Sequence, residues 1–225
     1  MPKRVDHEAR RTEIAEALWR IAGTRGLDGV SLREVAAEAD ISLGRLQHYF
    51  RTKDEMLLFA LRHINSLAER RIRERLGAPA AGPDRGEDQD RGEDQDPDPE
   101  QGPGPSPRVV LRACLAGMLP LDEKSRVGAL VGAAYFARAV HDERLCEEAR
   151  EGIPRLAEFF AALLRGAQER GELAAGRALD PYTEAMLLIS LVDGLTTYTL
   201  LGVQTGEEAL ARLDAHLERL FADAG

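Results

Sequence analysis

The stretch from residue 31 to residue 61 constrains the fold of this 225-residue chain more than any other part of it. Ser31 precedes an apolar run of helical period, and Glu34 follows three residues later, which is the pattern of a capping box at the start of a helix. After two turns Asp40 interrupts the pattern, and Ser42 is the next cap candidate. The pattern predicts two short helices joined by a tight turn, which is the arrangement of a helix-turn-helix.

The second predicted helix carries the side chains that can read DNA. Leu46 and Phe50 share one face, which can pack on the preceding helix. The opposite face is polar, and in a major groove Arg reads guanine, Gln reads adenine and Tyr bonds phosphate, while glycine allows close approach of the backbone. An ordinary helical corner with a solvated polar face is the alternative interpretation. The predicted DNA-binding residues are Ser31, Arg33, Ser42, Leu43, Gly44, Arg45, Gln47, His48, Tyr49 and Lys53.

Lys53 lies at the start of a third predicted helix. Thr52 with Glu55 forms a second capping box, and the helix is expected to run to about Leu76. Free backbone amides and the helix dipole make the first turn of such a helix an anion site, and a DNA phosphate is the obvious anion here.

The order of residues across this region resembles the TetR family of bacterial transcription regulators. The recognition helix of that family is a short Ser-x-Gly-x-Leu-x-His-Tyr-Phe run, followed by Lys-Asp/Glu-Glu-Leu. The resemblance covers residues 8–65 and implies binding to double-stranded DNA. Leu43 stands where the family often has Lys, and Gln47 where it often has Tyr, which affects the expected DNA sequence preference. The matching residues are Ser42, Gly44, Leu46, His48, Tyr49, Phe50, Lys53, Glu55 and Leu57.

A first helix is predicted over residues 7–25, with Gly26 ending it. Trp19 falls off the apolar stripe of this helix. It is either a partly exposed aromatic or a wedge between a DNA-binding and an effector domain, since a large exposed apolar group often marks a contact. Arg10 and Arg11 are either phosphate contacts or solvated side chains.

Charge is distributed unevenly along the chain. The net charge is −9, yet residues 1–75 carry 15 Lys and Arg against 12 Asp and Glu. DNA affinity depends on the local basic surface rather than on the whole-chain total. The modest basic excess of the N-terminal third predicts an operator footprint rather than a broad coating of DNA.

Other classes of protein are disfavoured by what the sequence lacks. The two cysteines, Cys114 and Cys146, have no metal-ligand spacing, and His141 does not share a helix face with Cys146, so we expect no metal site. The N-terminus is polar and the most apolar segment is far shorter than a membrane span, so we expect a cytoplasmic protein without a membrane partner. Because no phosphate-binding loop or catalytic motif occurs, we expect no enzymatic activity, no catalytic residues and no cofactor.

The expected fold class is all-α, with an N-terminal three-helix helix-turn-helix domain and a C-terminal helical domain for ligand binding and dimerisation. The Pro- and Gly-rich acidic loop between them repeats the hexamer RGEDQD and lacks large aliphatic residues, so it is predicted to be disordered. The predicted divisions are a DNA-binding domain over 1–53, a connecting helix over 54–76, the loop over 77–107 and the effector-binding and dimerisation domain over 108–225.

The last two of the helices predicted after the loop are the expected dimer contact. The helix over Tyr182–Leu201 is apolar nearly all round, and the last helix has an apolar stripe at Leu210, Leu213, Leu217 and Leu220. Pairing both helices with their symmetry mates would form a four-helix seam, as TetR-like proteins do, although both could instead serve packing within the chain. The resemblance implies a homodimer whose recognition helices reach grooves about 34–36 Å apart on a pseudo-palindromic operator. The helices predicted after the loop span about 108–119, 123–140, 143–170, 181–201 and 206–222.

A small-molecule effector is expected in the C-terminal half by analogy with the family. Asp193 is an acid inside an apolar helix, so it needs a partner: a ligand cation, a donor across the dimer or a backbone group. Each aromatic residue of this half could instead be plain core. The predicted ligand-binding residues are Met118, Tyr135, Phe136, Phe159, Tyr182, Met186, Ser190, Asp193 and Thr197, of which Met186, Ser190, Asp193 and Thr197 lie on one helical ridge.

These patterns together predict a TetR-like DNA-binding transcriptional regulator. We expect a repressor that a small, largely apolar ligand releases from its operator. One alternative is an activator of the same fold. Another is a helical module that binds small molecules or proteins and does not bind DNA.

Overall fold

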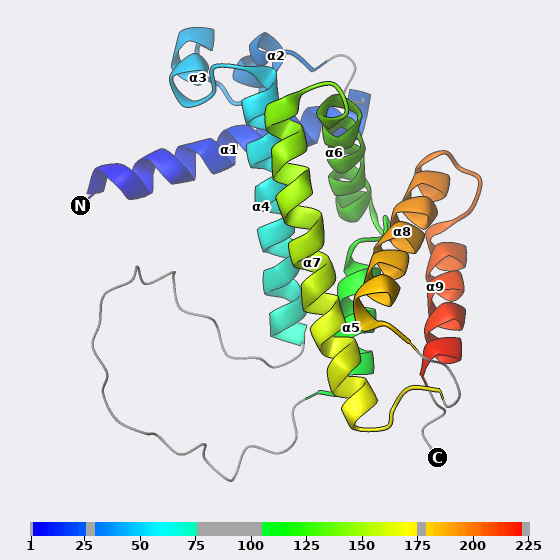
Figure 1. Ribbon diagram of the computed structural model, residues 1–225. Helices are drawn as coiled ribbons and strands as arrows, with labels where there is room; N and C mark the ends of the chain where they lie inside the picture. Colours follow the sequence, from blue (N-terminus) through cyan, green and yellow to red (C-terminus); the bar gives the residue numbers. More distant parts are fainter. Residues whose placement is uncertain (1, 26–29, 76–104, 175–178, 222–225) are drawn as a thin grey trace, which may run out of the picture.

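The computed structural model describes residues 2–25, 30–75, 105–174 and 179–221, and within these ranges the fold is all-α, as predicted (Figure 1). The observed bounds lie close to the predicted ones, except that α1 begins at Pro2 rather than at His7. The helices are α1 (Pro2–Arg25), α2 (Leu32–Glu38), α3 (Leu43–Tyr49), α4 (Lys53–Arg75), α5 (Pro107–Gly117), α6 (Glu123–Ala139), α7 (Glu143–Glu169), α8 (Pro181–Leu200) and α9 (Gly206–Leu220).

Two predicted features lie outside the described residues. Gly26, the expected end of the first helix, is one of them. The loop expected over residues 77–107 is the other, as far as residue 104. The end of that predicted loop is wrong by one residue, because Pro107 already belongs to α5, whose first turn is capped by the Ser106 hydroxyl.

The helix-turn-helix shares a hydrophobic core with α1 and with the first turns of α4. The predicted division at residue 53 therefore falls between elements that pack together. Val131 of α6 also reaches this core, so the N-terminal unit is joined to the C-terminal half by apolar contact. The buried residues of this core include Ile14, Leu18, Val35, Leu46, Phe50, Met56, Leu57 and Ala60.

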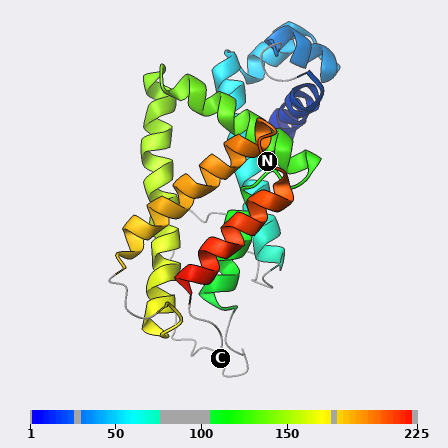
Figure 2. The ribbon, with the colours of Figure 1, turned by 90° about the vertical axis from the view of Figure 1, so that its right-hand side faces the viewer.

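A second core lies among α5, α7, α8 and α9. Figure 2 shows α8 and α9 running side by side on the face turned toward the viewer. Leu213, Leu217 and Leu220, predicted as part of the apolar stripe of the last helix, are buried in this core. The stripe of α9 is therefore used within the chain, and the outward apolar residues of this pair lie mainly on α8.

Two ion pairs hold α4 against the C-terminal half. Arg138 of α6 donates to the Asp54 carboxylate at 2.7 Å, and Arg62 Nε donates to Glu148 of α7 at 2.9 Å. These pairs are exposed to solvent, so each contributes little to stability. They mark where α4 lies beside α6 and α7.

Candidate DNA interface and interdomain cavity

The turn between α2 and α3 is formed by local hydrogen bonds that the sequence predicted. The Ser31 hydroxyl accepts from the Glu34 amide at 3.3 Å, and the Glu34 carboxylate accepts from the Ser31 amide at 2.9 Å, which confirms the capping box. Asp40 has a φ of +52°, in the left-handed region that Asp tolerates better than most residues. The Ile41 amide then bonds Ala36 at 2.9 Å and turns the chain into α3.

The short helix α3 presents one apolar and one polar face. Leu46 and Phe50 are fully buried against α1, α2 and α4, whereas Leu43 is half-buried. The Ser42 hydroxyl caps the helix by accepting from the Arg45 amide at 3.2 Å. This packing fixes the helix so that four residues predicted to contact DNA are exposed: Gly44, Arg45, Gln47 and His48.

Gly44 is free of intramolecular crowding. A Cβ placed there would meet no atom within 4 Å among the described residues. Since Gly44 adopts an ordinary helical conformation in this structure, neither packing nor backbone strain demands glycine. Close approach of an external surface is a reason that remains for a glycine on this exposed face.

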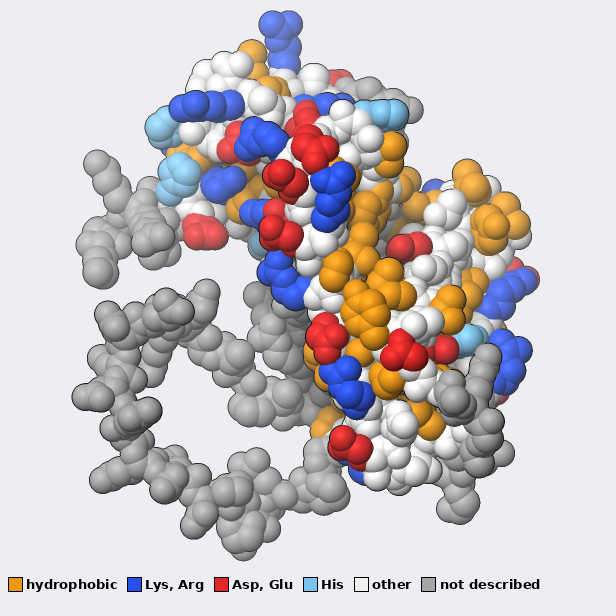
Figure 3. Space-filling view, in the orientation of Figure 1, with side chains coloured by type: hydrophobic (Ala, Val, Ile, Leu, Met, Phe, Trp, Pro, Cys, Tyr) orange, Lys and Arg blue, Asp and Glu red, His pale blue; other side chains and the backbone are white. Residues whose placement is uncertain are grey.

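The remaining predicted DNA-binding residues lie around α3. Ser31 and Arg33 are exposed at the start of α2, and Lys53 is half-buried in the first turn of α4. Glu55 donates its amide to Thr52, as a capping box requires, while its carboxylate accepts from the Arg51 amide. Figure 3 shows Arg, Lys and His side chains at the end of the molecule that carries α2 and α3.

Tyr49 joins α3 to α1. Its half-buried ring lies 4.7 Å from the His7 ring of α1, and His48 lies 6.1 Å from His7. The N-terminal part of α1 is therefore placed beside the recognition helix. His7 already belonged to the helix predicted over residues 7–25, but its contact with Tyr49 depends on how α1 packs beside α3, which local sequence patterns do not determine.

Arg11 makes a contact that neither interpretation of its sequence included. Its guanidinium carbon lies 4.4 Å from the centre of the Phe59 ring and 4.7 Å from that of Phe50. Its Nε is buried and has no hydrogen-bond partner within the described part of the chain. Arg11 is thus a packed residue of the α1–α4 interface rather than a solvated one.

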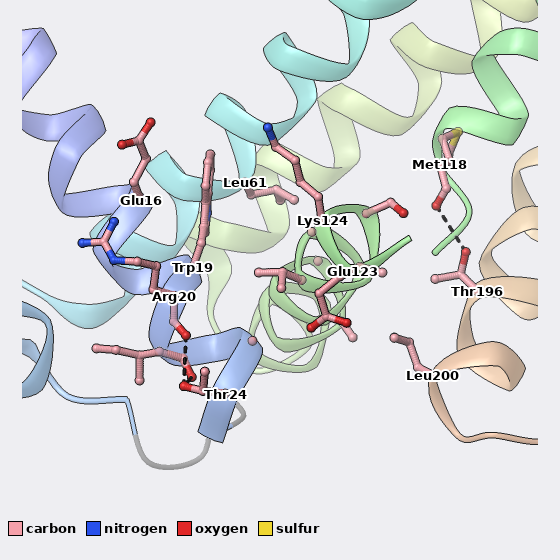
Figure 4. Close-up of a pocket in the computed structure, with 18 of the residues that line it drawn as sticks. Glu16, Trp19, Arg20, Thr24, Leu61, Met118, Glu123, Lys124, Thr196 and Leu200 are labelled. Carbon is pink, nitrogen blue, oxygen red and sulfur yellow. Dashed lines mark hydrogen bonds between the residues drawn. The ribbon is translucent and has the colours of Figure 1, made fainter. Parts of the chain in front are cut away.

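A large cavity opens between the DNA-binding unit and the C-terminal half. Its volume is about 1530 Å³, which is ample for a small organic molecule. One wall comes from α1 and α2, a second from α6 and the turn before it, and a third from α8. Figure 4 shows Trp19 on the α1 side, with Glu123 and Lys124 on α6 and Thr196 and Leu200 on α8.

Four of the predicted ligand-binding residues line this cavity. Met118, Phe136, Asp193 and Thr197 line it. The other five residues do not line it. Tyr135 is buried and donates its hydroxyl to the Leu145 carbonyl at 2.6 Å, and Ser190 donates to the Met186 carbonyl. Phe159, Tyr182 and Met186 lie on other surfaces of α7 and α8.

The residues predicted to share one ridge of α8 face different surroundings because they lie at different heights along the helix. Met186 packs against the second core, whereas Asp193 and Thr197, two turns further on, reach the cavity. The hydroxyl of Thr197 bonds the Asp193 carbonyl within its own helix at 2.9 Å. Residues on the same ridge of α8 therefore do not all line the same cavity.

Asp193 faces the cavity. Burial raises the pKa of its carboxyl above the ordinary range. A cation bound in the cavity beside this carboxyl would favour its charged form.

Sequence analysis missed the wall that α1 and α2 provide. Glu16, Arg20 and Glu38 line this side together with Trp19. Arg20 Nε donates to the Glu38 carboxylate at 2.7 Å and so joins α1 to α2. The position of Trp19 off the apolar stripe was the one signal that could have pointed here. Trp19 is half-buried and lines the cavity, which fits both interpretations of this residue.

Within the described ranges, no three His, Cys, Asp or Glu residues are grouped closely enough to hold a metal ion. Over the same ranges, no helix has the length and apolar character needed to cross a membrane.

Comparison with known proteins identifies both halves of the chain. Residues 14–60 match the family model of bacterial regulatory proteins of the TetR family, and residues 107–222 match the C-terminal model of BetI-type transcriptional repressors. The HTH-type transcriptional regulator PksA of Bacillus subtilis is 32% identical over 99% of this chain and 95% of its own length. The HTH-type transcriptional regulator BetI of Burkholderia cenocepacia is 28% identical over 78% of this chain and 89% of its own.

Solved structures share the whole fold. A transcriptional regulator from Rhodococcus sp. Rha1 is 29% identical, covers 93% of this chain and 95% of its own, and has a TM-score of 0.68. A regulator from Saccharomonospora viridis in complex with choline is 21% identical, covers 96% of this chain and 99% of its own, and has a TM-score of 0.74, which shows a common fold. These relatives are transcriptional regulators rather than enzymes. The chain therefore belongs to the TetR family of DNA-binding bacterial transcriptional regulators.

Proposed function

We propose that this protein is a cytoplasmic repressor that binds its operator through α3 and leaves it when an effector occupies the interdomain cavity. The observation that carries the proposal is that the cavity wall on one side belongs to α1 and α2, which also hold the recognition helix. A ligand in such a place can favour one arrangement of the two units over another. That difference in binding is what a ligand-controlled switch requires.

The repressor acts as a homodimer, paired through α8 and α9. Leu187, Tyr198 and Leu201 are exposed along the outer side of α8, where a monomer offers them nothing to pack on. On the neighbouring α9, Ala211 and Ala215 are exposed and small, which allows a second helix to approach closely. Two chains related by a twofold axis would bury these surfaces and present two recognition helices to a pseudo-palindromic operator.

The effector that best fits the cavity is an organic cation with an apolar body. Carboxylates outnumber cations in the lining, and Arg20 is already paired with Glu38. Trp19 and Phe136 offer aromatic surface, on which an alkylammonium group is favoured. The choline complex of the Saccharomonospora regulator, which shares this fold, supports the same class of ligand. The acidic side chains in the lining are Glu16, Glu34, Glu38, Glu123 and Asp193.

Gel shift with DNA from upstream of the protein's own gene tests the two parts separately. We expect a shift that benzyltrimethylammonium weakens, and that neopentylbenzene, its neutral isostere, does not. Absence of any shift would reject operator binding, whereas release by both compounds or by neither would reject the cationic effector. A reporter fused to the same DNA, compared with and without the regulator, separates repression from activation.

A further inference from the structure

The cavity is shared between the two units of the chain, and its α1 wall touches α6 directly beside it. Gly23 and Val127 both line the cavity, and a Cβ added to Gly23 would come within 3.0 Å of the Val127 side chain. The last turn of α1 therefore lies against α6 as closely as a glycine permits. A molecule that fills the cavity lies between these two elements and contacts the DNA-binding unit itself.

Trp19 is the aromatic residue on this wall, and it is held by stacking. Its ring lies 5.3 Å from the His63 ring of α4, with an interplanar angle of 23°. Its indole Nε1 is buried without a hydrogen-bond acceptor among the described residues. Since stacking is less directional than a hydrogen bond, the ring can slide when its other face gains or loses a neighbour.

The stack continues along the α1–α4 interface toward the recognition helix. The His63 ring lies 6.3 Å from Phe59 and is nearly parallel to it, at 4°. Phe59 in turn contacts the Phe50 ring directly, at 5.3 Å, and the Arg11 guanidinium, at 4.4 Å, which also lies 4.7 Å from the Phe50 ring. Phe50 is the residue that caps the C-terminal end of α3 and is itself fully buried. Cation–π and stacking contacts of this kind are strongest where water is excluded.

We propose that Trp19 contacts the effector, and that the row Trp19–His63–Phe59–Arg11–Phe50 couples occupancy of the cavity to the position of the recognition helix. The proposal rests on the proposed function and adds its route of regulation. The residues of the row between the two ends are positioning residues, because they touch neither ligand nor DNA. By linkage, operator binding must change effector affinity by the same factor as the effector changes operator affinity, and through this row we expect operator binding to change the surroundings of Trp19.

Trp19 is the one tryptophan of the chain, so it serves as a built-in reporter. The experiment titrates the full-length protein with the upstream duplex that it shifts, and follows Trp19 emission and its quenching by acrylamide. We expect a saturating change in both signals at the duplex concentration that completes the gel shift. A complete shift with unchanged emission and quenching would overturn the proposal and leave operator binding intact. A duplex that is not shifted at all would reject the proposed function, and the coupling with it.

A relocated tryptophan is the matched control. In the double variant Trp19→Phe, Phe159→Trp, the single tryptophan stands on α7 at an exposed position outside the cavity lining. This protein should shift the duplex with no saturating change in emission. An equal response from both proteins would contradict a signal specific to the Trp19 wall.

Interruption of the row tests the route. Phe59→Leu removes the contacts to His63 and to Arg11 while keeping an apolar side chain, and Phe159→Leu is the same exchange at an exposed site. We expect Phe59→Leu to shift the duplex without moving the Trp19 signal, and Phe159→Leu to behave as the unaltered protein. His63→Leu, which removes the stacks to Trp19 and to Phe59, gives the same result if Phe59→Leu unfolds. A full Trp19 response in a folded, row-broken variant would refute this route.

Discussion

At the scale of single residues, Asp193 and Arg45 show how one side chain can be assigned to a partner that the chain itself does not supply. Asp193 is held where burial raises the pKa of its carboxyl, and it faces a cavity with four further carboxylates. Arg45 is exposed on a helix whose opposite face is fully buried, so its direction is fixed while its guanidinium stays available. For both we propose a partner of opposite charge from outside the chain.

The raised pKa of Asp193 makes stability depend on pH in a definite direction. A carboxyl whose pKa is higher in the folded than in the unfolded chain favours folding when it is protonated, and this contribution is lost as pH rises through the folded pKa. Asp193→Asn should therefore be more stable than the unaltered protein at neutral pH, and equally stable below the ordinary carboxyl pKa of about 4. Urea denaturation at both pH values measures the difference, and a difference that does not vary with pH would contradict it.

The two basic residues at the DNA interface should differ in what they control. Arg45→Ala is expected to lower discrimination between operator and altered operator by about 1–3 kcal/mol, because Arg can read a guanine edge bidentately. Lys53→Ala should weaken binding to all sequences alike, since a phosphate contact carries no sequence information. Binding titrations against a panel of single-base operator variants distinguish the two. An Arg45→Ala protein with unchanged base preference would show that Arg45 does not read bases.

At the scale of elements, α8 contributes residues to three different surfaces. Its buried residues, among them Leu188 and Val192, face the second core, Asp193 and Thr197 face the cavity, and Tyr198 faces solvent on the outer side. This division explains why the helix is apolar nearly all round. The surface toward the second core and the outer surface are apolar. The surface toward the cavity carries Asp193, whose partner the sequence pattern did not determine.

The contact between α1 and α6 predicts a ligand-independent change of state. Gly23→Ala crowds the contact between α1 and α6, because the new Cβ would lie 3.0 Å from the Val127 side chain, and one of the two must give way. We expect weaker operator binding without any effector, for the same physical reason that a molecule in the cavity weakens it. Quantitative gel shift of the variant without added ligand is the measurement.

Gly152→Ala is the control for that substitution. It lies within α7, and a Cβ there meets nothing within 4 Å in the part of the chain that the structure describes. It should bind the operator normally and gain stability of roughly 0.5–1 kcal/mol, since Ala favours a helix over Gly. Loss of operator binding in both variants would mean that the α1–α6 contact is not the cause.

At the scale of the whole molecule, the two cores are joined rather than hinged on a single linker. Val131 of α6 packs in the N-terminal core, and α4 is bonded to α6 and α7 through Asp54 and Arg62. A rearrangement at the cavity therefore moves α1, α4 and the helix-turn-helix together. In a dimer, such a movement alters the separation of the two recognition helices, to which operator affinity is sensitive.

The dimer contact gives the prediction at this scale. Tyr198→Arg places a charge in the middle of the outer face of α8, and an unpaired charge in a buried contact is strongly unfavourable. Light scattering should show a monomer, and the operator should be bound much more weakly because two half-sites are no longer held together. Val140→Arg, at an exposed apolar position on the C-terminal end of α6, should remain dimeric. A Tyr198→Arg protein that stays dimeric would place the twofold contact elsewhere.

The amino-acid sequence by itself determined the local structure of this protein and the polar face of its recognition helix. Ser31, Ser42 and Thr205 cap helices by accepting hydrogen bonds from amides three residues away. The 3.6-residue period assigns Leu46 to the buried face of α3 and Arg45 to its exposed face. Such interactions need no knowledge of distant segments. The tertiary structure alone decided which residues line the cavity, because α1, α6 and α8 meet there although other helices separate them in the sequence. It also placed Arg11 between two aromatic rings and turned the leucines of α9 inward, since burial depends on which helix packs opposite.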